Sequence, residues 1–340
     1  MKLSEALLNW YDSNARTLPW RGETDVYRVW LSEIMLQQTR TEAVEKYYAR
    51  FLTRFPDVHA LANADEDEVL KLWEGLGYYS RARNLHAAAK TVSAVGGAFP
   101  DTVEGLQALS GIGPYAARAI ASIAFGICAP ALDGNQMRVL SRVLGVDRVL
   151  KTPFDLESEA QAEMSVERPG DYNQALMDLG ARVCKPKNPR CGDCPLAYRC
   201  AAHAEGDPER YPMRPAPVPK REENRTILLI QSPQGFAIRK RPDTGLLAGL
   251  YEFPSLDGFA DEAGLHAMFP EAERIRLLSD AKHVFTHRIW RMRGAHIVLR
   301  NEVPYENTFY ADADAIRARA FPSALRVYRE IALDILETEN

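Results

Sequence analysis

Apolar side chains recur at the spacing of an α-helix over residues 1–205. Two of these stripes are formed by Leu3, Leu7, Leu8 and Tyr11 and by Tyr27, Trp30, Leu31 and Ile34. A third stripe starts at Val69, directly after the acidic run 65–68, and acidic residues favour the first turn of a helix. The pattern predicts an almost entirely α-helical region.

Residues 206–223 interrupt this helical pattern. Prolines occur there at positions 208, 212, 215, 217 and 219. Proline cannot continue a helix, and closely spaced prolines favour an extended, semi-rigid chain. We therefore interpret the segment as an interdomain linker.

Beyond the linker, over 224–340, the period of the pattern changes. The strand-like runs are 226–230, 236–239 and 295–299, and the helical patterns are 261–269 and the tail from Pro322. This mixture predicts a small α+β domain. The protein is therefore expected to be multidomain, with an all-α region followed by an α+β unit.

Composition and charge limit the classes of protein to consider. With 340 residues, the chain is long enough for two or three domains. A net charge of −4 excludes a protein that coats nucleic acid through bulk positive charge, so any contact with DNA must come from local patches. No apolar run approaches the length of a membrane span, and the first residues lack a signal-peptide core. We expect a cytoplasmic protein.

Four of the five cysteines form the motif C-x6-C-x2-C-x5-C, at Cys184, Cys191, Cys194 and Cys200. Thiolates this close in a chain with so few other cysteines indicate a shared metal centre rather than disulfides. A zinc site usually has two short C-x2-C knuckles, whereas a compact all-cysteine set suits a 4Fe–4S cluster. The spacing favours the cluster, with zinc as the alternative. The fifth, Cys128, is expected to be a buried core thiol.

The loop between the first two cysteines is cationic. It contains Lys185, Lys187 and Arg190, no acidic residue and two prolines. A stiff basic loop held at both ends is suited to contacting DNA phosphates, and Lys187 and Arg190 are the candidates. The alternative is an ordinary solvated loop.

Two further features have spacing that suits DNA chemistry. Residues 106–117 predict a helix, a tight turn with Gly111 and Gly113, and a second helix, an arrangement that presents backbone amides to a phosphate. Asp133 precedes another predicted helix and suits an N-cap. A carboxylate anchored there stays ionised and can also face a developing cation.

In order and spacing, the hairpin, Asp133 and the four cysteines resemble the helix-hairpin-helix superfamily of base-excision DNA glycosylases, over nearly the whole chain. Its cluster-bearing members are the endonuclease III and MutY families. Endonuclease III-like enzymes have a nucleophilic lysine after the hairpin, where this chain has Tyr115. The resemblance to the MutY family of adenine glycosylases is therefore the closer one, and a strand-cleaving lyase activity is not expected.

Segment 31–40 resembles the catalytic helix of the MutY family. Glu33 alone would be interpreted as a surface charge, but the segments 16–21 and 75–81 match the same family. The resemblance implies Glu33, Asp133, Tyr115 and Asn135 as catalytic residues. It implies contacts with DNA or the base for Arg16, Trp20, Arg21, Gln37, Gln38, Thr39, Arg40, Leu76 and Tyr78.

The C-terminal segments 244–254 and 283–290 resemble the Nudix-like domain with which this family recognises 8-oxoguanine. The family usually has Phe-Ser-His where this chain has Phe285, Thr286 and His287, so the hydroxyl group is kept and a methyl group is added. A working Nudix hydrolase is the alternative. It needs a cluster of glutamates to hold divalent metal, and no such cluster follows Gly249.

The resemblance implies a six-helix barrel at about 20–125, an iron–sulfur lobe from 1–19 with 126–205, and a Nudix-like domain at 224–340. It implies a monomeric, nucleoid-associated monofunctional DNA glycosylase. The enzyme would hydrolyse the N-glycosidic bond of adenine opposite 8-oxoguanine or guanine in double-stranded DNA. The alternatives are an endonuclease III-like lyase and a non-catalytic iron–sulfur DNA-binding protein.

Overall fold

The computed structural model describes residues 2–216 and 219–338, and these form two compact units. The first unit contains 2–63 and 84–216, and the second contains 64–83 and 219–338. Helix α6 (Ser80–Ala94) begins in the second unit and continues in the first.

The predicted linker 206–223 contains a short 3₁₀ turn, η4 (Pro208–Arg210), and the first residues of strand β1 (Arg221–Ser232). Its positions 217 and 218 lie outside the described residues. The linker and domain boundaries stay a prediction.

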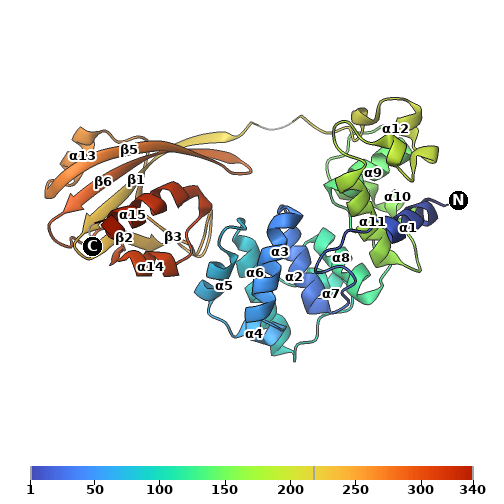
Figure 1. Cartoon of the computed structure of the whole chain (residues 1–340), viewed down its shortest axis with the longest axis horizontal. Helices are drawn as coiled ribbons and strands as arrows, with labels where there is room; N and C mark the ends of the chain where they lie inside the picture. Colours follow the sequence, from blue (N-terminus) through green and yellow to red (C-terminus); the bar gives the residue numbers. More distant parts are fainter. Residues whose placement is uncertain (1, 217–218, 339–340) are drawn as a thin grey trace. The chain divides into compact units, whose positions relative to one another are not determined.

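The first unit is helical, as the spacing of apolar residues predicted. Its further helices are α1 (Leu3–Asn14), α2 (Val26–Leu36), α3 (Thr41–Arg54), α4 (Val58–Ala62), α7 (Val103–Gln107), α8 (Pro114–Phe125), α9 (Gly134–Leu144), α10 (Glu157–Glu163), α11 (Pro169–Arg182) and α12 (Ala201–Ala204), with 3₁₀ turns η1 (Pro153–Leu156), η2 (Cys191–Asp193) and η3 (Ala197–Arg199). Helix α2 packs on α8, and α11 contacts α1, α8 and α9 (Figure 1). None of the described helices is both long and apolar enough to cross a membrane.

The predicted hairpin lies between α7 and α8. Gly111 has φ of +75°, and a Cβ atom there would approach Asn84 Cβ to 2.5 Å, so this position requires glycine. Gly113 caps α8 with an ordinary extended backbone, and no atom lies within 4 Å of where its Cβ would be. Gly111 and Gly113 are both exposed, so the turn is accessible to a macromolecular partner.

One apolar core joins α1, α9 and α11. Leu7, Leu140 and Leu176 are fully or almost fully buried in it, and Cys184, Cys194 and Cys200 pack against it. The cysteine loop is thereby fixed to the same core that supports the start of α9.

The second unit is an α+β domain, as predicted. Its elements are α5 (Glu66–Trp73), β1, β2 (Gly235–Lys240), β3 (Tyr251–Glu252), β4 (Ser255–Asp257), α13 (Glu262–Met268), β5 (Ala272–Val284), β6 (Arg288–Leu299), β7 (Phe309–Ala311), α14 (Ala313–Ala318), η5 (Ser323–Leu325) and α15 (Arg326–Thr338). The strand order is β3-β2-β1-β6-β5, with β4 paired to β1 and β7 to β2. Strands β1 and β6 are parallel, and the other pairs are antiparallel.

Strand β1 is buried on both faces of this sheet. Ile227 and Leu229 pack in the core with Tyr328 of α15, whereas Leu228 and Ile230 pack in the core with Leu265 of α13. Successive side chains of a strand point to opposite faces, so a strand covered on both sides needs a continuous apolar run. The run at 226–230 is this strand.

Candidate active site

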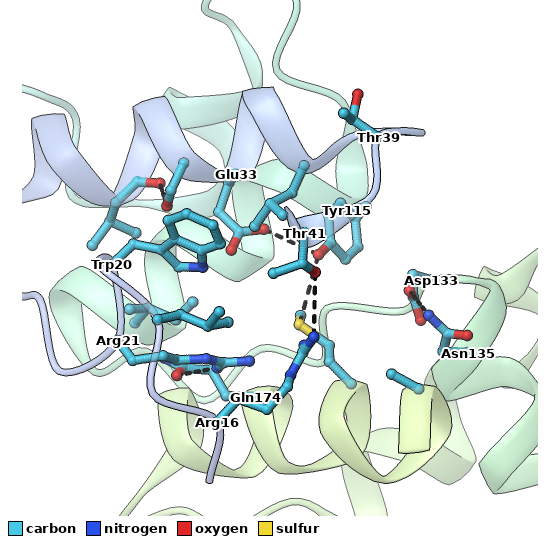
Figure 2. Close-up of a pocket in the computed structure, with 17 residues that line it drawn as sticks. Arg16, Trp20, Arg21, Glu33, Thr39, Thr41, Tyr115, Asp133, Asn135 and Gln174 are labelled. Atoms are coloured by element: carbon cyan, nitrogen blue, oxygen red, sulfur yellow. Dashed lines mark hydrogen bonds between the residues drawn. The ribbon is translucent and has the colours of Figure 1, made fainter. Parts of the chain in front are cut away.

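A pocket of about 170 Å³ opens in the first unit (Figure 2). A site for one water molecule needs only about 10–15 Å³ by this measure, so the pocket has room for a larger group. The lining comes from the segment before α2, from α2, from residues 39–41 at the start of α3, from α8, from the start of α9 and from α11. Its residues are Arg16, Leu18, Trp20, Arg21, Val29, Ser32, Glu33, Leu36, Thr39, Thr41, Tyr115, Ile123, Asp133, Asn135, Gln174, Met177 and Ala181.

Glu33 enters this pocket from α2 and is only 5% exposed. Its Oε2 accepts a hydrogen bond of 3.0 Å from the hydroxyl group of Tyr115. Burial raises the pKa of Glu33, against the opposing effects of the Tyr115 hydrogen bond and the Arg21 charge, and the nearby Asp133 raises it further. The pocket therefore favours the protonated form of Glu33 more than water does.

Tyr115 lies in the first turn of α8, directly after the hairpin. Burial and the neighbouring Glu33 and Asp133 carboxyls raise its pKa well above the ordinary value, so the phenol keeps its proton and remains a donor. Its hydroxyl group points at Glu33, as the dashed line in Figure 2 shows. No amine occupies this position.

Asp133 is the N-cap of α9. Its Oδ1 accepts the backbone N–H of Gln136 at 2.7 Å, and its Oδ2 accepts Nδ2 of Asn135 at 3.0 Å. Burial raises the pKa of Asp133, and these hydrogen bonds oppose the rise by stabilising the charged form. The N-cap role and the pocket-lining role thus belong to one residue, as the sequence allowed.

A chain of hydrogen bonds connects Asp133 with the cysteine loop. Arg138 donates from Nη2 to Asn135 Oδ1 at 3.0 Å and from Nε to the carbonyl oxygen of Cys184 at 2.8 Å. Asn135 in turn donates to Asp133. The orientation of Asp133 therefore depends on the backbone that also carries the first cysteine.

The opposite wall of the pocket has an arginine pair that is fixed by a fully buried carboxylate. Asp178 Oδ1 accepts from Arg16 Nε at 2.8 Å and from Arg21 Nη2 at 2.8 Å, and the Asp178 side chain is 0% exposed. Arg21 also donates to Gln174, which accepts from Tyr11 at 2.9 Å. Two positive charges thereby face the pocket in fixed positions.

The sequence did not indicate Asp178, Gln174 or Thr41 as site residues. Gln174 and Asp178 lie four residues apart on α11, among the buried apolar residues Ala175, Leu176 and Leu179. Polar residues at helical spacing within a buried helix were a readable signal of a polar site.

The segment 37–40 lies at the end of α2 and only partly reaches the pocket. Thr39 lines it, whereas Gln37 is the C-cap of α2 and Arg40 the N-cap of α3. Gln38 has φ of +57°, a conformation that residues other than glycine adopt at a cost in energy. Gln38 and Arg40 are exposed, so their side chains are accessible to a macromolecular partner.

All four cysteines of the motif line one pocket, together with Arg142. Arg142 donates from Nη1 to Cys184 Sγ at 3.4 Å and to the carbonyl oxygen of Lys185 at 2.7 Å. Within the described ranges, no group of three or more His, Cys, Asp or Glu side chains is arranged to hold a single metal ion. Four thiols around one partly apolar pocket are a donor set that suits an iron–sulfur cluster.

Burial raises the pKa of Cys194 to about 11 and also raises the pKa values of Cys191 and Cys200. Cluster binding requires thiolates, which the positive charge of bound iron stabilises. Lys185, Lys187 and Arg190 on the connecting loop are exposed. Arg190 lies 3.6 Å from Asp193, which offsets part of its charge.

Three family models match the chain. Residues 31–165 match the HhH-GPD superfamily of base excision DNA repair proteins, 184–200 match the iron–sulfur binding domain of endonuclease III, and 226–330 match the NUDIX domain. The adenine DNA glycosylase of Mus musculus is 37% identical over 347 residues, covering 83% of this chain and 67% of the relative. That of Rattus norvegicus is 35% identical, covering 89% of this chain and 71% of the relative.

This chain belongs to the adenine DNA glycosylase family.

Membership of this family confirms the resemblance to the MutY family of adenine glycosylases. The match at 184–200 supports a 4Fe–4S cluster, as expected, rather than zinc. The chain spans 55% of the length of the Arabidopsis thaliana relative, which is 36% identical to it.

Solved structures agree with the fold of the family. A thermostable thymine-DNA glycosylase superposes with a TM-score of 0.56 at 27% identity, covering 59% of this chain and 95% of that one. An endonuclease III bound to DNA superposes with a TM-score of 0.52 at 21% identity, covering 60% of this chain and 94% of that one, which shows the shared fold.

The predicted 8-oxoguanine loop lies in the second unit. Phe285 packs against Trp290 with ring centres 4.9 Å apart, while Thr286 and His287 are exposed. The hydroxyl group of Tyr78 lies 3.3 Å from Thr286 Oγ1. Tyr78 is 48% exposed, whereas Leu76 is buried at 7% exposure. The structure therefore brings Tyr78 and Thr286 together and leaves Leu76 in the interior.

Proposed function

We propose that this protein is a monofunctional adenine DNA glycosylase that removes adenine opposite 8-oxoguanine and, more weakly, opposite guanine in duplex DNA. The observation that carries the proposal is one pocket in which Glu33 and Asp133 occupy different environments and Tyr115 stands in the place of a lysine. The adenosine must leave the base stack to reach such a pocket.

Glu33 would act as the general acid. Adenine leaves poorly as an anion, so its departure needs a proton, which Glu33 would deliver to N7. The raised pKa of Glu33 favours its protonated form, and the Tyr115 hydroxyl group fixes the orientation of the carboxyl group. The Asp178-bound Arg16 and Arg21 supply a polar wall that orients the base.

Asp133 would stabilise the positive charge that develops on the sugar. Its two hydrogen bonds favour the carboxylate form and hold it in place. Asn135 would position Asp133 and the attacking water. The division into one neutral acid and one charged carboxylate is that of retaining glycosidases, in which the second carboxylate acts directly on the sugar.

DNA binding would rest on local contacts. The amides near Gly111 and Gly113 and the basic side chains of Lys187 and Arg190 are candidates for phosphate contacts. Exposed Thr286 and His287 are the candidates for contact with 8-oxoguanine. The four thiolates would hold the 4Fe–4S cluster, which when bound stabilises the loop that carries Lys187 and Arg190.

One experiment distinguishes the proposed activity from the alternatives. Duplexes with adenine opposite 8-oxoguanine, and with thymine glycol opposite adenine, are incubated with the protein and analysed before and after alkali. We expect alkali-dependent breaks at the adenine alone. Breaks without alkali at thymine glycol would indicate an endonuclease III-like lyase, and intact strands in both duplexes would indicate a protein that binds DNA without catalysis.

A further inference from the structure

The loop that carries Leu76 and Tyr78 has an unusual backbone conformation. Gly75, Gly77 and Tyr78 have φ values of +102°, +73° and +49°. Positive φ is unfavourable for tyrosine, and such conformations persist only when surrounding contacts hold them. Some contacts that hold this loop come from its neighbours Trp73 and Arg81, which donate to the carbonyl oxygen of Gly77 at 3.0 Å and 3.1 Å. Others come from residues 319–329, within the same compact unit.

Glu74, at the start of the loop, makes the central contact. Its Oε1 accepts from Nη1 of Arg329 on α15 at 2.7 Å and from the backbone N–H of Phe321 at 3.1 Å, and its Oε2 accepts from Lys71 at 2.6 Å. The side chains of Glu74 and Arg329 are 20% and 18% exposed. An ion pair formed by a partly buried carboxylate that accepts a further hydrogen bond is stronger than an ion pair exposed to solvent.

Tyr79 makes a second contact with the same segment. Its hydroxyl group donates to the carbonyl oxygen of Phe321 at 3.1 Å and accepts from the N–H of Gly75 at 3.3 Å. Both polar backbone atoms of Phe321 are therefore bonded to residues that flank the loop. Within the loop, the carbonyl oxygen of Gly77 accepts from Nε1 of Trp73 at 3.0 Å, which fixes the residue before Tyr78.

We propose that Glu74 is a positioning residue: through Arg329 and the backbone of Phe321, it holds the 75–79 loop so that Tyr78 meets both the mispair and Thr286. This inference rests on the proposed function and extends it. The C-terminal domain then has two roles, because it contacts 8-oxoguanine through residues 285–287 and also supports the loop that enters the DNA.

The test uses the full-length variants Glu74→Ala, Arg329→Met and the double variant. Single-turnover excision is measured with adenine opposite 8-oxoguanine. Insertion of Tyr78 is measured separately by the fluorescence of 2-aminopurine placed beside 8-oxoguanine, in a duplex whose adenosine cannot be cleaved. Each single variant should slow excision about tenfold, the effect of losing one charged hydrogen bond, and should reduce the fluorescence change.

The double variant should be no slower than the slower single variant, because both changes remove the same interaction. Arg317→Gln is the matched control, because the Arg317 side chain pairs with Asp314 of α14 and Glu337 of α15. This variant should leave both signals unchanged. Wild-type excision and fluorescence in Glu74→Ala and Arg329→Met would overturn the inference. If the wild-type protein removed no adenine, the proposed function would fail, while the fluorescence change would still decide the role of Glu74. Arg329→Met tests the same contact if Glu74→Ala does not fold.

Discussion

Glu33 and Asp133 show how the surroundings of a carboxyl group determine what it can do. Burial raises the pKa values of both residues. Glu33 has a phenol hydroxyl as its partner, whereas Asp133 has a backbone N–H at a helix start and an amide group. The helix dipole and the second hydrogen bond favour the charged form of Asp133. The two residues are therefore suited to acid and carboxylate roles, respectively.

The first prediction concerns the variant Glu33→Gln. Glutamine keeps the shape of the side chain and can accept the Tyr115 hydrogen bond, but it cannot supply a proton. We expect the mismatch affinity to be retained and the single-turnover rate to fall by about 10²- to 10⁴-fold, the usual contribution of a general acid. The control is Glu23→Gln, which changes a partly exposed carboxylate that precedes α2 and pairs with Arg28. An undiminished rate in Glu33→Gln would remove Glu33 from the acid role.

The second prediction concerns stability. The folded-state pKa of Glu33 is raised, so below the unfolded value of about 4.3 both states are protonated and its burial carries no ionisation penalty. As pH rises from that value to the folded pKa, only the unfolded state ionises, and the folded state loses stability. The free energy of unfolding of Glu33→Gln should therefore exceed that of wild type by a margin that grows over this range and then becomes constant. Denaturant unfolding of both proteins at several pH values measures this difference in the free energy of unfolding. A difference independent of pH would contradict a raised pKa of Glu33 in the folded state.

At the residue scale, the sequence was informative where a side chain stands beside a recognisable turn or cap. Asp133 and Tyr115 follow such signals, and both line the pocket. Asp178 was not predicted because its importance comes from burial against Arg16 and Arg21, which lie far from it in the chain. A local pattern does not show which distant cations a buried carboxylate will meet.

Among the elements, α9 joins the candidate chemistry to the cysteine loop. Its first residues hold Asp133, and Arg138 one turn later bonds both Asn135 and the carbonyl oxygen of Cys184. Movement of the cysteine loop would thus be transmitted to the side chain that faces the sugar. The cysteine loop also carries exposed positive charges, on Lys185, Lys187 and Arg190.

The third prediction concerns this cationic loop. Lys187 and Arg190 are exposed, and each phosphate contact releases counterions from the DNA. The slope of log affinity against log salt is negative, and the double variant Lys187→Gln/Arg190→Gln should make it shallower by about 2. The change should be about 1 if Asp193 already neutralises Arg190. Filter binding or fluorescence anisotropy at several salt concentrations measures the slope. Arg300→Gln, which removes an exposed arginine paired with Glu273, is the control, and an unchanged slope in the double variant would contradict phosphate contact.

Helices and strands with a clear periodic pattern of apolar residues could be predicted from the sequence. Strands that form mainly through pairing with a neighbouring strand could not. The apolar run at 226–230 predicted β1 because this strand is buried on both faces. Strand β5 was missed, because it pairs only with β6 among the described strands, and many of its side chains are charged and exposed. Its alternating Ile275 and Leu277 were the weak signal that remained.

In the whole molecule, the pocket and the predicted recognition loop belong to different compact units. The pocket residues lie within 2–63 and 84–216, whereas Thr286 and Tyr78 lie in the unit of 64–83 and 219–338. The assignment of 64–83 to the second unit could not be predicted from the sequence, because its helical pattern resembles that of its neighbours. Residues 64–83 associate with the rest of the second unit through specific contacts, such as the hydrogen bond from Arg329 to Glu74.

The fourth prediction follows from this division. Thr286→Val keeps the size of the side chain but removes the hydroxyl group that lies 3.3 Å from the Tyr78 hydroxyl. We expect this hydroxyl group to contact 8-oxoguanine. Its loss should slow excision opposite 8-oxoguanine about tenfold, whereas excision opposite guanine should change little. The ratio of the two single-turnover rates is the measurement, and Thr286→Ser, which restores the hydroxyl group without the methyl group, is the matched control.

Glu33→Gln should instead slow both reactions by the same factor, because the departing adenine is the same in each. A change in Thr286→Val that was equal for the two mispairs would mean that this hydroxyl group supports the loop of Tyr78 rather than distinguishing the opposite base. Discrimination would then have to come from another part of the C-terminal domain, for which the exposed His287 is the next candidate.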